Sequence, residues 1–402
     1  MERARRLQAI APYPFAEIAR LKEQALAEGW DLIDFGIGDP DMPPPECAKR
    51  ALAEAVEVGP LNNYDESSYG LPAFLDAVAA WFKDRFGVEL EPRGEIKVTI
   101  GSKEALAKAA WAYINPGDVS LVPTPGYGVY ASNTQFAGGE AYAMPLGPDT
   151  GYLPDLDAVP AEIANRAKLL FLNYPHNPTG AVATEEFYQR AVEFAERYDI
   201  LICSDAAYSE VYYGDEPPMS ILAVDGAKER AIEFHSFSKT FCMTGWRLGW
   251  MCGFEDGVAG VSRMKSYVDS NAFPAMQQAG AVTLRCGGGY ASQVRAAYKR
   301  RRDILVEGLR SIGWTVEPPQ GTFFVWVPSP QGMTSAEAAA KLLSEAHVIT
   351  IPGSSYGEYG EGYIRFSLTM RADDVEARIA EAVDRISRLD LSSGQGRERC
   401  AT

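Results

Sequence analysis

The feature that most constrains the fold of this chain is a series of short, mostly apolar stretches with helical stretches between them. The apolar stretches are residues 96–100, 119–123, 168–173, 200–205 and 231–236. A strand that is apolar along its whole length is usually buried on both faces, as happens when helices cover both sides of a parallel sheet. The sequence therefore predicts an α/β fold whose large domain holds a mostly parallel sheet between helices.

Periodicity also predicts the remaining elements and the division into domains. Helical patterns occur at 16–28, 46–56, 72–86, 104–114, 185–198, 291–309, 335–346 and 373–389. Further strand-like stretches occur at 31–37, 348–351 and 363–368, with two pieces inside 314–327. After residue 286 the pattern changes to that of a smaller α+β domain. We expect an N-terminal arm (1–46) that joins the small domain (287–391), a large domain (47–286) and a flexible polar tail (392–402).

Chemically active residue types recur where the predicted strands end. They are Ser102, Tyr127, Asn177, Asp205 and Lys239. In open parallel sheets, ligands bind beyond the carboxyl ends of the strands. Five such residues at five matching positions indicate a binding site along one edge of the sheet.

Lys239 follows the apolar stretch 231–236 and has apolar and glycine neighbours. Burial lowers the pKa of an amine, and a partly neutral amine can form a Schiff base with an aldehyde. Ser236 and Arg247, which follows the lysine by eight positions, would suit a phosphate. An aldehyde and a phosphate together suggest pyridoxal phosphate. On this segment alone, a surface lysine in a strand-to-loop turn is an equal alternative.

The composition excludes several other classes of protein. The net charge of −16 argues against sequence-independent binding to nucleic acid, which needs a basic surface. The three histidines form no pattern with metal-ligand spacing, so we expect no metal site. Six scattered cysteines without a CxxC pair are mostly expected to be buried thiols. No signal peptide or membrane-spanning stretch is visible, so we expect a soluble, cytoplasmic protein.

Five motifs carry a resemblance to a known family. They are GIGDPD from Gly36, GSKEAL from Gly101, NYPHNPTG from Asn173, SDAAYSE from Ser204 and SFSKT…GWRLG from Ser236. With these motifs in this order, nearly the whole chain resembles the pyridoxal-phosphate aminotransferases of fold type I, class I/II. The resemblance implies the matching two-domain fold, transfer of an amino group from an L-amino acid to a 2-oxo acid in a ping-pong cycle, and a homodimer with shared active sites.

The resemblance also implies a role for each matching residue. Lys239 would hold the cofactor and act as the base, and Asp205 would face the pyridine nitrogen. Tyr208 and Asn177 would bond the ring oxygen, with Tyr208 counted among the catalytic residues. Tyr127 would stack on the ring. The phosphate would be held by Ser102, Lys103, Ser236 and Arg247, and by Tyr64 of the neighbouring subunit.

For the substrate, the resemblance implies that Arg365 binds the α-carboxylate, with Gly38 and Asn177 beside it and Tyr13 near the distal end. Within the family, the motifs are most similar to those of LL-diaminopimelate aminotransferases, which act in lysine biosynthesis. Alanine (glutamate–pyruvate) and aspartate aminotransferases share the same core, as do enzymes that eliminate a C–S bond. A non-catalytic binding or regulatory protein of this fold is the alternative from another class.

Overall fold

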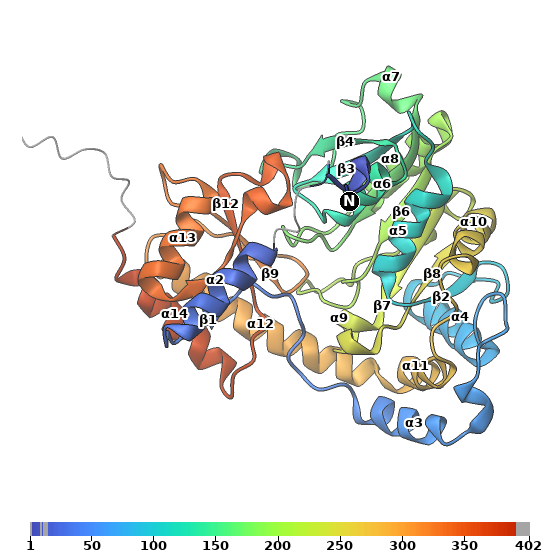
Figure 1. Cartoon of the computed structure of the whole chain (residues 1–402), viewed down its shortest axis with the longest axis horizontal. Helices are drawn as coiled ribbons and strands as arrows, with labels where there is room; N and C mark the ends of the chain where they lie inside the picture. The colour runs from blue at the N-terminus through green and yellow to red at the C-terminus, as the bar shows by residue number, and fades with distance from the viewer. Residues whose placement is uncertain (1, 9, 11–14, 391–402) are drawn as a thin grey trace, which may run out of the picture.

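The central sheet of the molecule has seven strands in the order β2-β8-β7-β6-β5-β3-β4, as the computed structural model shows (Figure 1). The structure describes residues 2–8, 10 and 15–390. The strands of this sheet are β2 (Ile96–Thr99), β3 (Val119–Thr124), β4 (Glu140–Pro145), β5 (Ala167–Asn173), β6 (Leu201–Asp205), β7 (Ala231–Ser236) and β8 (Gly249–Gly253). Only β8 runs antiparallel to its neighbours, so the predicted mostly parallel sheet is confirmed.

Two of these strands, β4 and β8, were absent from the sequence prediction. Strand β4 lies at the edge of the sheet and is mostly only half-buried, so it lacks a continuous apolar run. Strand β8 reads GWMCG, and the glycine at each end hides its strand character. Both strands can be recognised only from their pairing with neighbouring strands in the structure.

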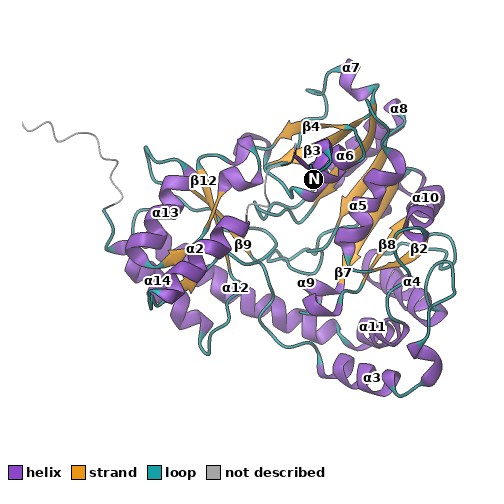
Figure 2. Ribbon diagram, viewed as in Figure 1, coloured by secondary structure: helices purple, strands orange, loops and turns teal. Residues whose placement is uncertain are grey.

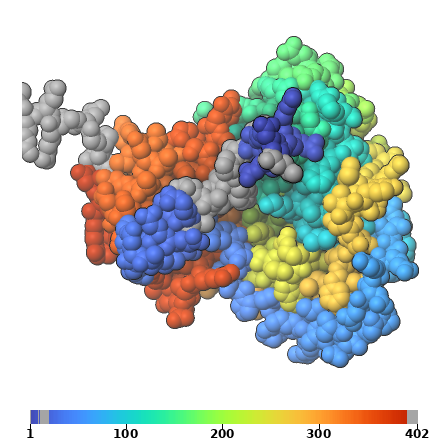
Figure 3. Space-filling model, viewed as in Figure 1, coloured from blue at the N-terminus to red at the C-terminus, as the bar shows by residue number. Residues whose placement is uncertain are grey.

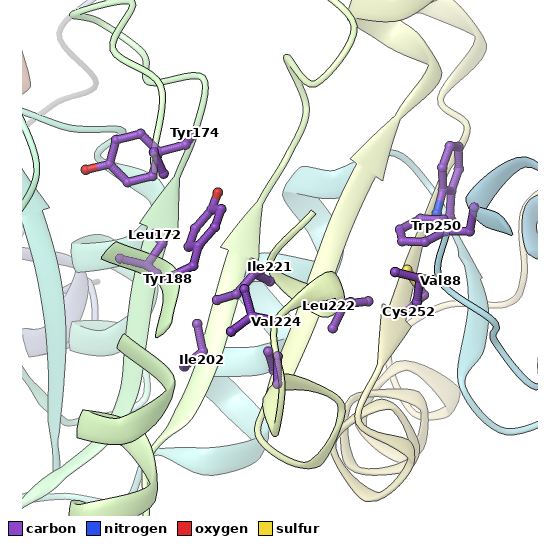
Figure 4. Close-up of a cluster of buried hydrophobic side chains, with 14 of the residues drawn as sticks. Val88, Leu172, Tyr174, Tyr188, Ile202, Ile221, Leu222, Val224, Trp250 and Cys252 are labelled. Carbon is purple, nitrogen blue, oxygen red and sulfur yellow. The ribbon is translucent and has the colours of Figure 1, made fainter. Parts of the chain in front are cut away.

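Helices cover both faces of the sheet (Figure 2). The helices of this part are α3 (Glu46–Val56), α4 (Pro72–Phe86), α5 (Ser102–Tyr113), α6 (Val129–Phe136), α7 (Ala161–Ala164), α8 (Glu185–Tyr198), α9 (Phe237–Thr240), α10 (Glu255–Ser266) and α11 (Pro274–Cys286). Side chains of α4, α8 and α11 share one core with one face of the sheet, and those of α5, α6 and α10 share a second core with the other face. Figure 4 shows part of the first core, where Leu172, Ile202 and Trp250 project from three strands.

A smaller sheet forms the other part of the molecule (Figure 1). It has the antiparallel order β11 (Ile351–Pro352), β12 (Tyr363–Ser367) and β9 (Phe324–Pro328). The helices around it are α12 (Gly288–Ser311), α13 (Ser335–Ala346) and α14 (Val375–Ser387). Nearby, β1 (Ile33–Asp34) of the arm pairs in parallel with β10 (Val348–Ile349).

The arm packs on this smaller part. Phe35 is fully buried in its core and meets Phe366 edge-on at 5.3 Å. Trp30 stacks on His347 with ring centroids 4.5 Å apart. The space-filling view shows α2 (Phe15–Ala27), in blue, lying over the orange C-terminal part (Figure 3). A short helix, α1 (Arg5–Gln8), precedes it and contacts α6 instead.

The predicted strands of the smaller part are shorter than expected. Strand β1 ends at Asp34 because the Asp34 carboxylate accepts a hydrogen bond of 2.8 Å from the Gly36 N–H, which turns the chain. Of the two pieces expected within 314–327, only β9 forms. The Val316 carbonyl accepts a hydrogen bond from Arg310 at 2.7 Å and has no strand beside it. The predicted tail, 392–402, lies outside the described residues.

The cysteines differ from the expectation in one respect. Cys203, Cys242 and Cys252 are buried free thiols, as predicted. Cys47 at the start of α3 and Cys286 at the end of α11 form a disulfide, which the sequence did not reveal because 239 positions separate them. Cys400 lies outside the described residues. In the part of the chain that the structure describes, no helix is both long and apolar enough to cross a membrane.

Candidate active site

The polar residues at the strand ends come together along one edge of the central sheet. Asp205 is the last residue of β6, and Lys239 lies in α9 directly after β7. The Asn173 side chain, at the end of β5, donates a hydrogen bond of 2.7 Å to the Asp205 carbonyl oxygen. The backbone N–H of Asn177 donates in turn to the Asn173 side chain at 2.9 Å. These bonds place the turn after β5 beside the end of β6.

Lys239 is a buried amine with an unusually low pKa. Burial lowers its pKa to about 8, Asp39 opposes the change, and Arg365 and Arg247 add to it. Its Nζ donates a hydrogen bond of 2.8 Å to the Gly38 carbonyl oxygen. With a pKa near 8, a fraction of this amine is neutral and nucleophilic at neutral pH.

Asp205 is a buried acid close enough to Lys239 that each affects the titration of the other. Burial raises its pKa to about 6, while hydrogen bonds from the Tyr130 hydroxyl and the Ala207 N–H lower it. The hydroxyl lies 2.8 Å from Oδ2, and the N–H lies 3.3 Å from Oδ1. The carboxylate is therefore held in a fixed orientation and can stay ionised at neutral pH.

Tyr130 is a site residue that sequence reasoning missed. It is fully buried in α6, stacks on Phe171 at 4.8 Å and meets Tyr127 edge-on at 5.7 Å. Its position three residues after Tyr127 gives no signal by itself, because an aromatic residue on a short helix is usually part of a core. Only the sheet order, which brings β3 and α6 near β6, shows its role.

The start of α5 lies against Arg247 in a turn with the geometry suited to an anion. The turn has Gly101 at φ +73°, and α5 has no side-chain cap, so its first N–H groups remain available to a ligand. A Cβ on Gly101 would lie 2.6 Å from Arg247 Nη2, so the close approach requires glycine. Burial and the nearby Arg247 charge lower the pKa of Lys103. Ser236, at the end of β7, caps α9 by accepting from the Ser238 N–H at 3.2 Å.

Arg365 and Asn177 are brought together by β12 and the turn after β5. Arg365 is only 2% exposed, and its Nη1 donates to Asn177 Oδ1 at 3.1 Å. Its Nη2 donates to the Gly36 carbonyl at 2.9 Å. The guanidinium lies 3.8 Å over the Phe324 ring, which fixes its plane. This arrangement presents a planar fork of donors beside the Gly36–Gly38 backbone.

The other predicted residues differ in where the structure places them. Tyr208 is buried and meets Phe323 and Phe324 edge-on, and Lys103 Nζ lies 6.0 Å over the Tyr127 ring. Tyr64 is 83% exposed and is not part of the site within this chain. Tyr13 lies outside the described residues. Within the described ranges, no group of His, Cys, Asp and Glu could hold a metal ion.

The donor set and the buried lysine together fit a phosphorylated aldehyde. A helix N-terminus and Arg247 would bind the phosphate, and Lys239 would react with the aldehyde carbon. Asp205, a buried carboxylate, would favour a positively charged ring nitrogen. This is the structural requirement for binding pyridoxal phosphate.

Comparison with known proteins gives a consistent result over almost the whole chain. Residues 31–386 match the family model described as aminotransferase class I and II. Curated LL-diaminopimelate aminotransferases are similar over nearly their full length. The one from Moorella thermoacetica is 49% identical (97% of this chain and 98% of the relative covered), and the one from Aquifex aeolicus is 45% identical (96% and 98%).

Solved structures of aminotransferases and of BacF are also similar to this chain over almost its whole length. Substrate-bound BacF from Bacillus subtilis has a TM-score of 0.91 at 34% identity, with 96% of this chain and 98% of that chain covered. A double mutant of aspartate aminotransferase from Thermus thermophilus has a TM-score of 0.88 at 30% identity, with 96% and 99% covered.

Proposed function

Because this chain belongs to the class I and II aminotransferases, we propose that it is a pyridoxal-phosphate enzyme that moves an amino group from LL-2,6-diaminopimelate to 2-oxoglutarate. Relatives named LL-diaminopimelate aminotransferase, 45–49% identical over nearly their full length, are the observation that carries the substrate assignment. Aspartate aminotransferase is the second candidate, supported by the similarity to the Thermus thermophilus structure. The reaction belongs to lysine biosynthesis.

When bound, pyridoxal phosphate supplies an aldehyde that condenses with amines and a ring that draws electron density from the substrate carbon. Lys239 Nζ would hold the cofactor in the resting enzyme and would then carry the proton that leaves the substrate Cα. Its lowered pKa allows both roles near neutral pH, because the amine can be neutral without losing all basicity.

Asp205 would face the ring nitrogen and keep it protonated, which strengthens the ring as an electron acceptor. Tyr130 would hold the carboxylate in place through its 2.8 Å hydrogen bond. Tyr208 and Asn177 would bond the ring oxygen, and Tyr127 would stack on the ring. These roles follow from the family, and the burial of Asp205, Tyr130, Tyr208 and Asn177 supports them.

The phosphate would be held by Ser102, Lys103, Ser236 and Arg247. Arg365 would bind the substrate α-carboxylate through its fork of donors, with the Gly38 backbone and Asn177 next to it. Tyr13 would contact the distal end of the substrate.

The active unit would be a homodimer in which Tyr64 reaches the phosphate of the partner subunit. Two observations support this. Tyr64 and Tyr267 are 83% and 86% exposed, so both side chains are free to reach a partner subunit. Their loops are also linked, because Asn271 donates a hydrogen bond of 2.9 Å to Asp65.

We also propose the division of the chain into an arm (1–46), a large domain (47–286) and a small domain (287–391). Separate sets of buried residues support it: two lie on the faces of the central sheet, and a third lies around the smaller sheet and includes Ile33 and Phe35 of the arm. A cytoplasmic location stays a prediction.

The test is a half-reaction screen with purified, cofactor-loaded protein. Single amino acids are added, and the loss of the aldehyde absorbance is followed. LL-diaminopimelate and glutamate should react, and alanine and aspartate should react much more slowly. Fast reaction of aspartate without any reaction of LL-diaminopimelate would overturn the substrate assignment, and release of ammonia and pyruvate would indicate elimination chemistry instead.

A further inference from the structure

Four charged side chains form a closed ring beside the N-terminus of α5. Lys265 Nζ donates to Glu104 Oε1 at 2.8 Å and to Asp269 Oδ1 at 2.6 Å. Lys108 Nζ contacts the second oxygen of each of these two carboxylates. Both lysines are almost completely buried. We call Glu104, Lys108, Lys265 and Asp269 the charge quartet.

The charge quartet pairs two carboxylate side chains with two lysine side chains, so opposite charges balance within it. Burial raises the pKa of Asp269, but the hydrogen bonds and the charges of Lys108 and Lys265 together lower it more, so the net change is downward. Apolar residues of similar volume are often as stabilising as a buried ion-pair cluster. Stability is therefore a weak explanation for the quartet, and its connections suggest another.

The first connection leads to the proposed phosphate-binding turn. Glu104 lies in the first turn of α5, and its Oε1 also accepts a hydrogen bond of 2.9 Å from the Ile100 N–H. This bond fixes the backbone that leads into Gly101 and Ser102. A lone carboxylate here would repel a phosphate dianion, but two buried ammonium groups neutralise it.

The second connection leads to the loop of Tyr64. Two residues after Asp269, the Asn271 side chain accepts from Lys97 Nζ at 2.6 Å and donates to Asp65 Oδ2 at 2.9 Å. Lys97 also donates to the Ser68 carbonyl at 2.7 Å. Gln277, fully buried, donates to the same Asp65 oxygen at 2.9 Å. The loop next to Tyr64 is thus bonded to the segment that the quartet holds.

We propose that the charge quartet is a positioning device that joins the phosphate-binding turn and the Tyr64 loop into one hydrogen-bonded unit. Phosphate binding by one subunit is then coupled to the contact that its own Tyr64 makes with the partner subunit. The inference rests on the proposed cofactor and dimer, and it adds the residues that couple them.

The first experiment compares two ligands that differ only in the phosphate. Pyridoxal phosphate and pyridoxal are each titrated into cofactor-free protein and followed by absorbance. Lys265→Met should weaken the binding of pyridoxal phosphate by about 10-fold, in the range usual for coupled sites, and leave pyridoxal binding unchanged. Lys265→Arg should restore most of the lost affinity for pyridoxal phosphate.

Arg85→Met is the matched control. Arg85 pairs with buried Glu210 at 2.8 Å. When Arg85 is replaced, Glu210 still has a second cation, Arg295. In the same way, Glu104 still has Lys108 when Lys265 is replaced. The control should leave the ratio of the two affinities unchanged. Equal weakening of both ligands by Lys265→Met, or no weakening, would overturn the proposal.

The second experiment uses Asn271→Ala, a half-buried site where folding should survive. Dimer dissociation is measured by analytical ultracentrifugation, with and without inorganic phosphate. The wild-type dimer should tighten when phosphate is added, and the variant should lose most of this response. An equal response in both proteins would contradict the coupling. Wild-type protein that binds neither pyridoxal compound would contradict the proposed function itself, together with this inference.

Discussion

The Tyr130 hydroxyl donates a hydrogen bond of 2.8 Å to Asp205 Oδ2, in a region where both side chains are buried. The bond stabilises the charged form of an acid that burial pushes toward its neutral form. Its removal should therefore shift the acid towards its protonated state.

Tyr130→Phe should raise the pKa of Asp205, because the ionised carboxylate loses a donor. The acid limb of the kcat/KM profile should move to higher pH by about one unit, the size expected for one hydrogen bond to a charged group. A pH–rate profile from pH 5 to 9 measures this. A profile that falls uniformly, with no shift of the acid limb, would count against this role for Tyr130.

Asp205→Asn should separate stability from activity. Burial raises the pKa of Asp205 from 3.8 to about 6, so the folded protein binds this proton more tightly than the unfolded chain does. The ionised carboxylate thus destabilises the cofactor-free fold above about pH 6, and this cost disappears below the unfolded pKa. The variant should gain up to about 3 kcal/mol of unfolding free energy at pH 8, a gain that shrinks towards pH 4.

Urea denaturation of the cofactor-free protein at pH 8 and at pH 4 measures the change in unfolding free energy. The kcat is measured separately on cofactor-loaded protein. We expect kcat to fall by several orders of magnitude while stability at pH 8 rises. Loss of both together would mean that the carboxylate supports the fold instead of the chemistry.

Lys239→Ala should abolish covalent attachment of the cofactor, because no other buried amine among the described residues is placed beside Asp205 in the site. The measurement is borohydride reduction followed by mass spectrometry of the intact chain. The wild-type protein should trap one cofactor per chain, and its rate of attachment should rise with pH towards about 8, where the amine becomes neutral. Reduced cofactor on the variant would assign the attachment to a different lysine.

Arg365→Lys should raise KM for amino-acid substrates by about 10- to 100-fold, since an ammonium group cannot reproduce two parallel hydrogen bonds. The shorter reach of lysine also loses the stacking of the guanidinium on Phe324. Steady-state kinetics with LL-diaminopimelate measure the effect, and the affinity for pyridoxal phosphate serves as the control that should not change. An unchanged KM would remove Arg365 from the substrate site.

The parts of the fold that the sequence predicted well depend on local signals. Helix α4 begins with Pro72 in its first turn and is followed by Gly87 in the left-handed conformation, and α8 is capped by the Thr184 side chain. For α13, Thr334 and Glu337 form a capping box. These signals lie within a few residues of the helix ends, which explains why the predicted bounds match the observed ones.

The parts that could not be predicted depend on contacts between distant segments. The bond between Tyr130 and Asp205 spans 75 positions, and the contacts of Lys265 with Glu104 span 161. The family motifs mark Lys239, Asp205 and Arg365, because those residues recur in fixed local patterns. They do not mark the residues that hold these groups in place, which become visible only in three dimensions.

The disulfide between Cys47 and Cys286 lies at two of the places where the chain passes from one core to the other. Residues 36–45 lead from the arm into α3, and Gly287 separates α11 from α12. The Tyr290 hydroxyl also bonds the Pro43 carbonyl across the same junction. Any turning of the small core against the large one would therefore have its axis near these cysteines. The cross-link would therefore leave the two halves free to pivot at this junction but not to come apart there.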